Sequence, residues 1–550
     1  MKLKKISCLA MVLAMLMSAA ACGGTTAPPG ESTSDTTAEG KTILKVGTYD
    51  GGVGTAWLDD AAKAFEEKYA NVSFNEAAGE MGVKVDIVGN KGYNGATLLD
   101  GTLDRDVYFT EDVSYFDHVN KGNFANITDI VTEQLTEYGE TGTIEGKLDA
   151  LQQDYLKAKD GQYYALPFYD GIHGIVYDRD MFNTNKWFFD ADGEIGVGES
   201  GNLSAGPDGK METTYDNGLP ATYEQFEELL ATIRGKTIVP FSYSGFASEY
   251  VKRMLTNFWS DYEGYEQMRL NYTFNGTANI VTSIDGDTLT TVEQKIDDTN
   301  GYLLQKQAGK YYALRFMDDI MLGNSANIPT NGISHTDAQK NYIVGALANG
   351  EGGAKIYAMH IDGIWWENEA TSSFANYETI YGKGKMERRF AFMPIPKVSA
   401  DKAGKQTLMS LNDSYAFINK NASNMELAKA FFQFLHTDAQ MSTFTVKTST
   451  TRSLKYEISA TDTAKMSYFG QSVVELKKNA DIVYPLSSVS KVINNPSYFD
   501  TDAWSWNTLV GGNPYKDPFM NLLEVGSLTA QSYFNGLSVQ YSENSWKGLK

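Results

Sequence analysis

The chain contains very little cysteine. Only Cys8 and Cys22 occur among its 550 residues, and Cys8 lies in an N-terminal apolar segment that we expect to be removed. The remaining chain would keep one thiol, which excludes an internal disulfide, a cysteine-based zinc site and a thiol nucleophile. The folded body must then be stabilised by its core, and a chain of this length buries roughly three quarters of the surface that its unfolded form exposes.

Basic residues are also scarce. The chain has 47 Lys and Arg against 69 Asp and Glu, a net charge of −22. Without the three lysines of the first five residues, 44 basic residues remain and the charge is −25. A surface this acidic repels nucleic acid and anionic lipid headgroups, so we expect neither as a partner.

Aromatic residues, in contrast, are plentiful, with 33 Tyr, 27 Phe and 8 Trp. Tyr and Trp present a flat apolar face with a polar edge, which suits the apolar face and hydroxyl rim of a sugar ring. Large cores are rich in aromatic residues as well, so composition alone permits both interpretations.

Residues 1–21 have the layout of a secretory signal: three lysines, an apolar run over 6–17 and small residues up to the cysteine. The apolar run is too short for a membrane span. Cys22 with its following glycines resembles the lipobox of bacterial lipoproteins, although Ala19 stands where that family usually has Leu. The resemblance implies a lipid on Cys22. An ordinary signal peptide that leaves Cys22 as an incidental thiol is the alternative.

Residues 22–41 are rich in Gly, Thr, Ser and Pro, which predicts a flexible tether. Beyond it, strands are predicted at 43–49, 83–88 and 106–109, and amphipathic helices begin after capping boxes at Thr222/Gln225 and Ser423/Glu426. A further helix carries Trp57, Ala61, Phe65 and Tyr69 on one face. Alternating strands and helices predict an α/β fold, and the length suggests more than one domain.

The segment 183–219 is rich in Gly, Asp and Asn, and we expect an inserted surface loop. Within it, Asp190 to Glu194 place acidic residues at alternate positions, a pattern that Ca²⁺ sites share. The terminal Glu of a twelve-residue calcium loop is missing, which favours a tight acidic turn. We predict no metal site and no cofactor.

Four blocks of the sequence resemble the extracellular solute-binding proteins of ABC sugar importers, the family of maltose-binding protein. They are DVYF at 106–109 with its sequel to Thr128, GQYYALP at 161–167 running to VYDRDMF at 176–182, AMHIDGIWW at 358–366 followed by FAFMPIP at 390–396, and NDSYAFI at 412–418 leading into the helix that ends at Leu435. Each block alone is weak, but their order and spacing cover most of the chain.

The resemblance implies two α/β lobes with a ligand cleft between them. Lobe one would comprise residues 42–167 and 411–455, and lobe two residues 168–410 and 456–550. The C-terminal tail from Asp481 is longer than the family leads us to expect. Its aromatic residues suggest that it packs on the cleft or closes over it: Tyr484, Tyr498, Phe499, Trp504 and Trp506.

The resemblance also implies which residues contact the ligand. Carboxylates and amides would bind sugar hydroxyls, and hydrogen bonds to charged groups contribute roughly 1.5–3 kcal/mol each. The matching positions are Tyr49, Asp50, Glu111, Asp112, Asp170, His173, Trp365, Trp366, Asn412 and Asp413.

Several of these positions have a structural alternative. Asp112 is equally suited to cap a helix, and Asp170 beside Gly171 to form a turn. His173 fits a satisfied structural histidine, and a Trp such as Trp365 is a core residue in most proteins.

The family implies a carbohydrate-binding protein, not an enzyme, which delivers its ligand to an ABC permease; we expect the ligand to be an oligosaccharide. It would act as a monomer, lipid-anchored on the outer face of the cell membrane. A lipid-anchored glycoside hydrolase with paired carboxylates is an alternative, as is a peptide or polyamine ligand for the same fold. The sequence contains no G-x-S-x-G, H-E-x-x-H or phosphate-cradling glycine loop to favour an enzyme.

Overall fold

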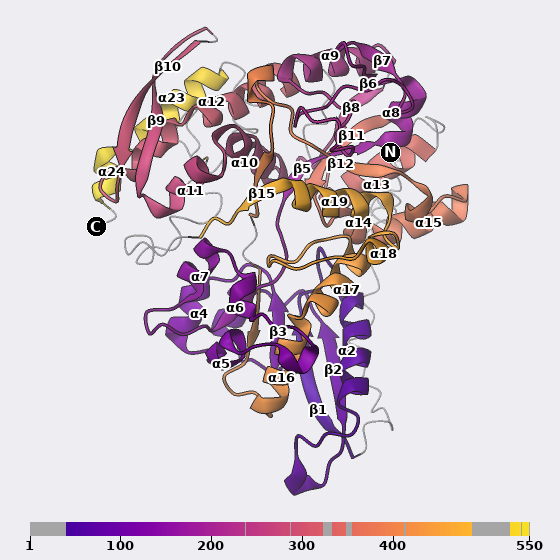
Figure 1. Ribbon diagram of the computed structural model, residues 1–550, viewed down its shortest axis with the longest axis vertical. Helices are drawn as coiled ribbons and strands as arrows, with labels where there is room; N and C mark the ends of the chain where they lie inside the picture. The colour runs from indigo at the N-terminus through magenta and orange to yellow at the C-terminus, as the bar shows by residue number, and fades with distance from the viewer. Residues whose placement is uncertain are drawn as a thin grey trace, which may run out of the picture. The chain divides into compact units, whose positions relative to one another are not determined.

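The computed structural model describes residues 40–236, 238–286, 288–322, 333–347, 355–411, 414–486, 506, 528–540 and 542–548 (Figure 1). The chain divides into two compact units. The smaller comprises residues 1–43 and 69–84; in its described part Thr42 N donates to Gly82 O at 3.1 Å, and a 3₁₀ turn, η2, spans Glu76–Ala78. The larger unit, residues 44–68 and 85–550, contains the candidate site.

The first sheet has five strands in the order β2-β1-β3-β14-β4. They are β1 (Thr42–Thr48), β2 (Val83–Gly89), β3 (Val107–Thr110), β4 (Ala165–Pro167) and β14 (Tyr415–Ile418). β1 and β3 are parallel, whereas β14 is antiparallel to both β3 and β4. Every residue of β3 and β14 is buried, as expected for central strands covered on both faces. The three predicted strands are confirmed to within a residue or two.

Helices from distant parts of the chain cover this sheet. α2 (Ala56–Lys68) buries Trp57, Ala61 and Phe65, and so confirms most of the predicted apolar face. It packs against α16 (Met425–Leu435) and α17 (Asp438–Thr448), which Figure 1 shows in orange beside indigo α2. The remaining elements of this region are α3 (Gly95–Asp100), α4 (Tyr115–Lys121), α5 (Thr128–Thr132), η3 (Thr136–Tyr138), α6 (Ile144–Lys147) and α7 (Ala150–Leu156).

The start of α16 differs from the prediction. The capping residue is Asn424, whose side chain accepts the N–H of Leu427 at 3.0 Å, and not Ser423. Ser423 instead donates its hydroxyl to Asp106 Oδ1 at 2.8 Å, and its N–H binds the same oxygen. A carboxylate from a distant strand end thus removes Ser423 from the capping position.

We expect Asn424→Ala to lower the free energy of unfolding by about 1 kcal/mol, because the first turn of α16 loses its side-chain acceptor. Glu426→Ala should change it by less than about 0.5 kcal/mol, since surface changes outside such features have small effects. Urea denaturation of both variants compares them directly. A larger loss for Glu426→Ala than for Asn424→Ala would favour a capping box of Ser423 and Glu426.

The second sheet has four strands in the order β12-β5-β11-β8. They are β5 (His173–Asp178), β8 (Val239–Ser242), β11 (Tyr357–Gly363) and β12 (Phe390–Met393). β11 runs parallel to β8 and antiparallel to β5, and every residue of β5 and β11 is buried. The surrounding elements are α8 (Arg179–Asn185), α9 (Tyr223–Arg234), α13 (His335–Leu347), α14 (Trp366–Glu369), α15 (Thr371–Tyr381), η7 (Lys385–Glu387), η8 (Ala400–Lys402), α18 (Ala460–Thr463) and α19 (Tyr468–Asn479).

The predicted start of α9 is confirmed. Thr222 accepts the N–H of Gln225 at 3.3 Å, and the helix buries Phe226, Leu229, Leu230 and Ile233. The Gln225 side chain accepts from Ala221 N rather than from Thr222 N. The reciprocal half of the capping box is therefore shifted by one residue.

A helical group adjoins the second sheet. It comprises α10 (Glu249–Glu263), α11 (Tyr265–Thr273), η4 (Gly301–Lys306), α12 (Ala308–Arg315), the π-helical η5 (Phe316–Leu322), the hairpin β9 (Gly276–Asp285) and β10 (Thr288–Ile296), and the pair β13 (Gln406–Met409) and β15 (Ala480–Val483). From the tail, α23 (Ala530–Gln540) packs on α12 (Figure 1). The last helix is α24 (Glu543–Lys547).

The described aromatic residues of the tail pack within this helical group. Trp506 is buried beside Trp259, with ring centroids 6.0 Å apart, and donates its N–H to Thr256 at 2.8 Å. Tyr498, Phe499 and Trp504 lie outside the described residues. Where the tail is described, it therefore forms part of a core. Tyr484, earlier in the tail, contacts Asp170.

The segment 183–219 contains a short hairpin of β6 (Phe188–Phe189) and β7 (Ile195–Val197). Its turn is the Asp190–Glu194 sequence, and Asp190 Oδ1 accepts the N–H groups of Asp192 and Glu194, both at 3.0 Å. This oxygen therefore already accepts two hydrogen bonds within the turn. Throughout the part of the chain that is described, no helix is both long and apolar enough to cross a membrane.

Candidate functional site

The first half of the candidate site follows two strands of the first sheet. Tyr49 and Asp50 come directly after β1, and Glu111 and Asp112 directly after β3. Because β1 and β3 are parallel neighbours, their carboxyl ends meet at one edge of the sheet, the edge where open α/β sheets bind ligands. The pKa of Tyr49 is raised by burial and then by the charges of Glu111 and Asp112, so these four predicted residues lie together.

Asp112 does not cap a helix. The N-cap position of α4 belongs to Ser114, and Asp112 is an exposed residue with φ of 57°. A side chain rarely adopts this left-handed conformation. The backbone is fixed there by close packing, since a Cβ added to Gly95 would lie 2.4 Å from Asp112 O.

The second half of the site follows the strands of the second sheet. His173 opens β5 and pairs with Gly363 at the end of β11, so Trp365 emerges at the same edge. The rings of His173 and Trp365 are 4.8 Å apart and nearly perpendicular. Tyr250 of α10 lies 5.3 Å from the His173 ring and 6.1 Å from the Trp365 ring. The three rings form one aromatic group.

The two halves meet at Gly52. A Cβ added there would lie 3.6 Å from both Glu111 Oε1 and Trp365 Cδ1, and 3.2 Å from the Tyr169 hydroxyl. Gly52 has φ of +30°, and its carbonyl accepts the side-chain N–H of Asn368 at 3.0 Å. A carboxylate and an indole ring therefore flank one point of backbone whose conformation favours glycine.

Burial raises the pKa of Glu111 to about 7. The Tyr169 hydroxyl donates to Glu111 Oε1 and opposes this rise, as does the positive charge of Arg253. The negative charges of Asp112 and Glu369 act in the same direction as burial. Glu111 thus changes its charge near neutral pH, the range in which functional carboxyls are often found.

Glu369 belongs to a second polar group beside the aromatic rings. Gln339 Nε2 donates to Glu369 Oε2 at 2.6 Å and to Asp362 Oδ2 at 3.0 Å. His335 Nε2 lies 3.5 Å from Glu369 Oε1, and its hydrogen bond to Glu369 raises the pKa of His335. His360 Nε2 pairs with Asp362 at 2.9 Å. The carboxylate of Glu369 is therefore held in place.

His173 is almost fully buried, at 1% exposure, and neither ring nitrogen has a hydrogen-bond partner within the described part of the chain. Burial and then the positive charge of Arg253 lower its pKa well below the usual range, although the backbone of Gly171 acts in the opposite direction. A neutral imidazole offers one donor and one acceptor. A buried polar group of this kind is expected to gain a partner.

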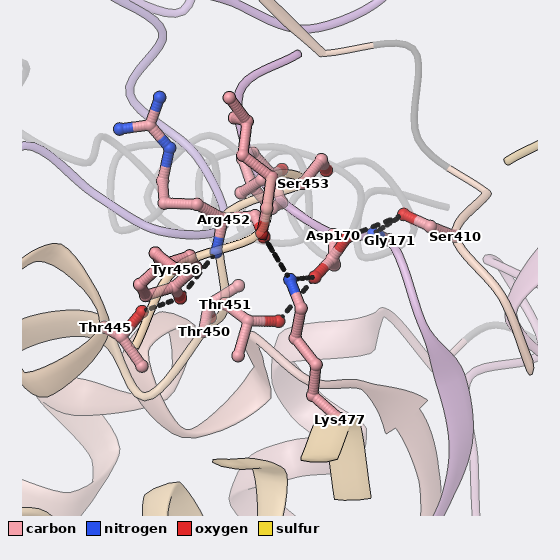
Figure 2. Close-up of polar contacts among 12 residues, drawn as sticks. Asp170, Gly171, Ser410, Thr445, Thr450, Thr451, Arg452, Ser453, Tyr456 and Lys477 are labelled. Atoms are coloured by element: carbon pink, nitrogen blue, oxygen red, sulfur yellow. Dashed lines mark hydrogen bonds and ion pairs between the residues drawn. The ribbon is translucent and has the colours of Figure 1, made fainter. Parts of the chain in front are cut away.

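Asp170 has a different role from the other predicted residues. It is fully buried, and its carboxylate binds Lys477 Nζ at 2.7 Å and the Thr451 hydroxyl at 2.6 Å on Oδ2. The hydroxyls of Ser410 and Tyr484 lie 3.3 Å from Oδ1. Figure 2 shows Asp170 and Lys477 at the centre of this network.

The network joins the three segments in which the chain passes between the first sheet and the second. Asp170 lies between β4 and β5, Ser410 between β13 and β14, and Thr451 between α17 and α19. Lys477 also donates to the carbonyl of Arg452 (Figure 2). We therefore interpret Asp170 as the residue that connects the passages, not as a ligand contact.

Trp366 is also placed in a core. Its ring is fully buried and packs with Tyr342, His360, Phe374, Phe390 and Phe469. The neighbouring Glu367 anchors the same turn by accepting the hydroxyls of Ser449 and Ser467. Asn412 and Asp413 lie outside the described residues, so their predicted contacts stay predictions.

A cavity of about 530 Å³ lies elsewhere. It is lined by Lys147, Asp149, Gln152, Tyr265, Glu266, Leu454, Lys455, Lys477, Ala480, Asp481, Ile482 and Tyr484. Several of its polar groups already have partners: Lys147 pairs with Glu140 and Asp438, and Asp149 accepts the Tyr265 hydroxyl at 2.9 Å. We favour the site at Gly52 because it combines aromatic rings, carboxylates and unpartnered imidazole nitrogens.

The sequence did not single out Tyr169, Tyr250, Asn368 or Glu369. Asn368 and Glu369 follow Trp365 by three and four residues, so one helical turn beyond the matched motif was the available signal. Tyr169 precedes Asp170 directly. Tyr250 carries no local signal, because it reaches the site through the packing of α10.

Comparison with known families matches residues 51–442 to the bacterial extracellular solute-binding proteins. A search of curated protein sequences finds no match. Among solved structures, similar folds include the solute-binding protein RafE in complex with raffinose, at 14% identity and a TM-score of 0.53, covering 92% of this chain and all of that one.

Two other structures are similar to a comparable degree. Maltose-bound MalE3 of T. maritima has 12% identity and a TM-score of 0.51, with 92% of this chain and 100% of that one covered. The GacH receptor of Streptomyces glaucescens has 13% identity and a TM-score of 0.50, with 92% and 98% covered. These similarities confirm the predicted two-lobed α/β fold. With a family match across more than half of its length, the chain belongs to the bacterial extracellular solute-binding proteins.

Proposed function

We propose that the protein binds a carbohydrate between Glu111 and Trp365 and delivers it to the permease of an ABC importer. The observation that carries this proposal is the meeting of a carboxylate and an aromatic group at Gly52. The apolar face of a sugar ring stacks on an indole, and its hydroxyls pair with carboxylate, amide and imidazole groups. The carbohydrate ligands named for RafE, MalE3 and GacH support the same class of ligand.

The Asn368–Gly52 hydrogen bond suggests how binding would be coupled to closure. It joins the side chain of Asn368, in α14, to the backbone of the loop after β1, so the segments that follow the two sheets already touch at the site. A ligand that contacts both halves would favour the conformation in which they meet, because only that conformation gains all of its contacts. We propose that the monomer presents this closed form to the permease.

A glycoside hydrolase is the second candidate, because Glu111 and Glu369 are two carboxylates beside one site. The two proposals differ in what happens to the sugar. We expect a panel of mono- and oligosaccharides to contain members that change the tryptophan fluorescence and are recovered intact. Conversion of a bound glycan by the pure protein would favour the hydrolase, and binding of peptides or polyamines alone would replace the carbohydrate proposal.

We also propose that a lipid on Cys22 holds the protein at the membrane, on the outer face. Tethering raises the local concentration of loaded protein near its permease without adding affinity. Cys22→Ala should move the protein from the membrane fraction to the medium or soluble fraction and leave its sugar affinity within about twofold. Continued membrane association of Cys22→Ala after a carbonate wash would contradict lipid attachment at this residue.

A further inference from the structure

Carboxylates outnumber basic groups around the proposed site. Burial raises the pKa of the Tyr49 hydroxyl, and the negative charges of Glu111, Asp112, Glu369 and Asp50 raise it further. Among the described residues two basic side chains face these groups: Arg253 acts on Glu111, and His335 lies beside Glu369. When all six groups are ionised, four negative charges stand against two positive ones.

Charged groups farther from the proposed site do not remove this excess of negative charge. Asp362 and Glu249 both add negative charge near His335 and Tyr250. Asp362 is itself paired with His360. Like charges held close together in a partly buried site repel one another, and a cationic group of a ligand offsets that cost.

The aromatic group indicates a second property of the ligand, in addition to its positive charge. His173, Tyr250 and Trp365 present rings at the same point, and a cation over an aromatic face is attracted by the ring. Within the described residues the buried ring nitrogens of His173 have no partner of hydrogen-bond geometry, although the backbone of Gly171 acts on the ring. A polar group of a ligand beside Trp365 would pair with them. A ligand that combines a ring, hydroxyls and an ammonium group would bind the aromatic rings, the His173 nitrogens and the carboxylates together.

We infer that the preferred ligand is an amino sugar, a saccharide that carries a protonated amine placed between Glu111 and Glu369. This inference rests on the proposed carbohydrate function and adds the chemical class of the sugar. The amine donates charge-assisted hydrogen bonds to the two carboxylates, which are about twice as strong as those of a neutral hydroxyl. The sugar ring stacks on Trp365.

The test compares saccharides that differ only in an amine and a hydroxyl at carbon 2. The pairs are glucosamine with glucose, galactosamine with galactose, and the β-1,4-linked trimers of glucosamine and glucose. Calorimetric titration at pH 7.5 and low salt should give about tenfold tighter binding for the amine of at least one pair, and added salt should reduce the difference.

Two variants test whether the amine preference depends on Glu111 and Glu369. Glu111→Gln and Glu369→Gln should each reduce the amine preference to about threefold or less. The preference is the ratio of two affinities measured on the same variant, so a loss of affinity that both saccharides of a pair share does not change it. Asp100→Asn is the matched control, because Asp100 is an exposed carboxylate paired with Lys121 away from the site. It should retain the full preference.

The affinity for the amino sugar should change with pH in a defined direction. Burial and the charges of Asp112 and Glu369 raise the pKa of Glu111 to about 7, against Tyr169 and Arg253, so its negative charge grows from pH 6 to pH 7.5. As long as the amine of the ligand stays protonated, its binding relative to that of the neutral sugar should therefore strengthen over this range. In Glu111→Gln this strengthening should become smaller, and the part that remains is due to His335, whose pKa is raised by its hydrogen bond to Glu369.

Equal or weaker binding of the amine in every pair would overturn the inference and leave the carbohydrate function standing if neutral sugars bind. An amine preference that persists in both Glu→Gln variants would also overturn it, because the amine would then lie elsewhere. If no saccharide of the pairs or the wider panel binds, the inference and the proposed function fail together.

Discussion

Trp365→Ala is expected to weaken sugar binding about 30- to 1000-fold, a loss of about 2–4 kcal/mol. The indole is 7% exposed and lies against Gly52, His173 and Tyr250, so its removal would take away the surface on which we propose that the sugar stacks. Titration calorimetry with the best glycan of the panel measures the loss.

Two further variants separate a binding effect from a folding effect. Trp365→Phe keeps an aromatic face and should lose less affinity than the alanine variant. Trp187→Phe changes a fully buried tryptophan that packs against Phe182, and it should bind sugar as the parent protein does. Unchanged affinity in Trp365→Ala would remove this residue from the site.

Lys477→Met should lower the free energy of unfolding by about 3–5 kcal/mol, because it leaves the fully buried Asp170 carboxylate without its cation. The hydroxyls of Thr451, Ser410 and Tyr484 would remain as partners, but none of them carries charge. Urea unfolding followed by circular dichroism gives the value.

The control for this prediction is Lys405→Met. Lys405 forms an ion pair with Asp481 at 2.6 Å, and both side chains are about half exposed, so its loss should cost less than about 1 kcal/mol. Asp170→Asn combined with Lys477→Met should be more stable than the sum of the two single changes predicts, because the pair is removed together. Equal costs for Lys477→Met and Lys405→Met would show that the network of Figure 2 contributes little to stability.

Local sequence patterns were sufficient for most of the elements. The strands β1, β2 and β3 and the apolar face of α2 follow from alternation and from spacing along the chain. The start of α16 did not, because Ser423 is drawn to Asp106, which lies more than three hundred residues away in the sequence. Asn424 then provides the cap.

At the site, too, contacts between residues distant in the sequence decide what local patterns cannot. Tyr49, Asp50, Glu111 and Asp112 were named from the family resemblance, and they lie together because they follow neighbouring parallel strands. Trp365 and Trp366 are adjacent and chemically identical, yet the turn after β11 directs one ring to the site and the other into the core. We interpret Asp170 as a structural residue from its partners Ser410, Thr451 and Lys477, which the local sequence could not indicate because they are 240 or more residues distant.

The location of the ligand is the central claim, and fluorine NMR of protein labelled with 5-fluorotryptophan tests it directly. The Trp365 resonance is identified by its absence in Trp365→Phe, and the buried Trp187 and Trp366 provide internal references. On addition of a saccharide that binds, the Trp365 resonance should shift while those of Trp187 and Trp366 stay in place. Saturating binding that leaves the Trp365 resonance unchanged would contradict the account.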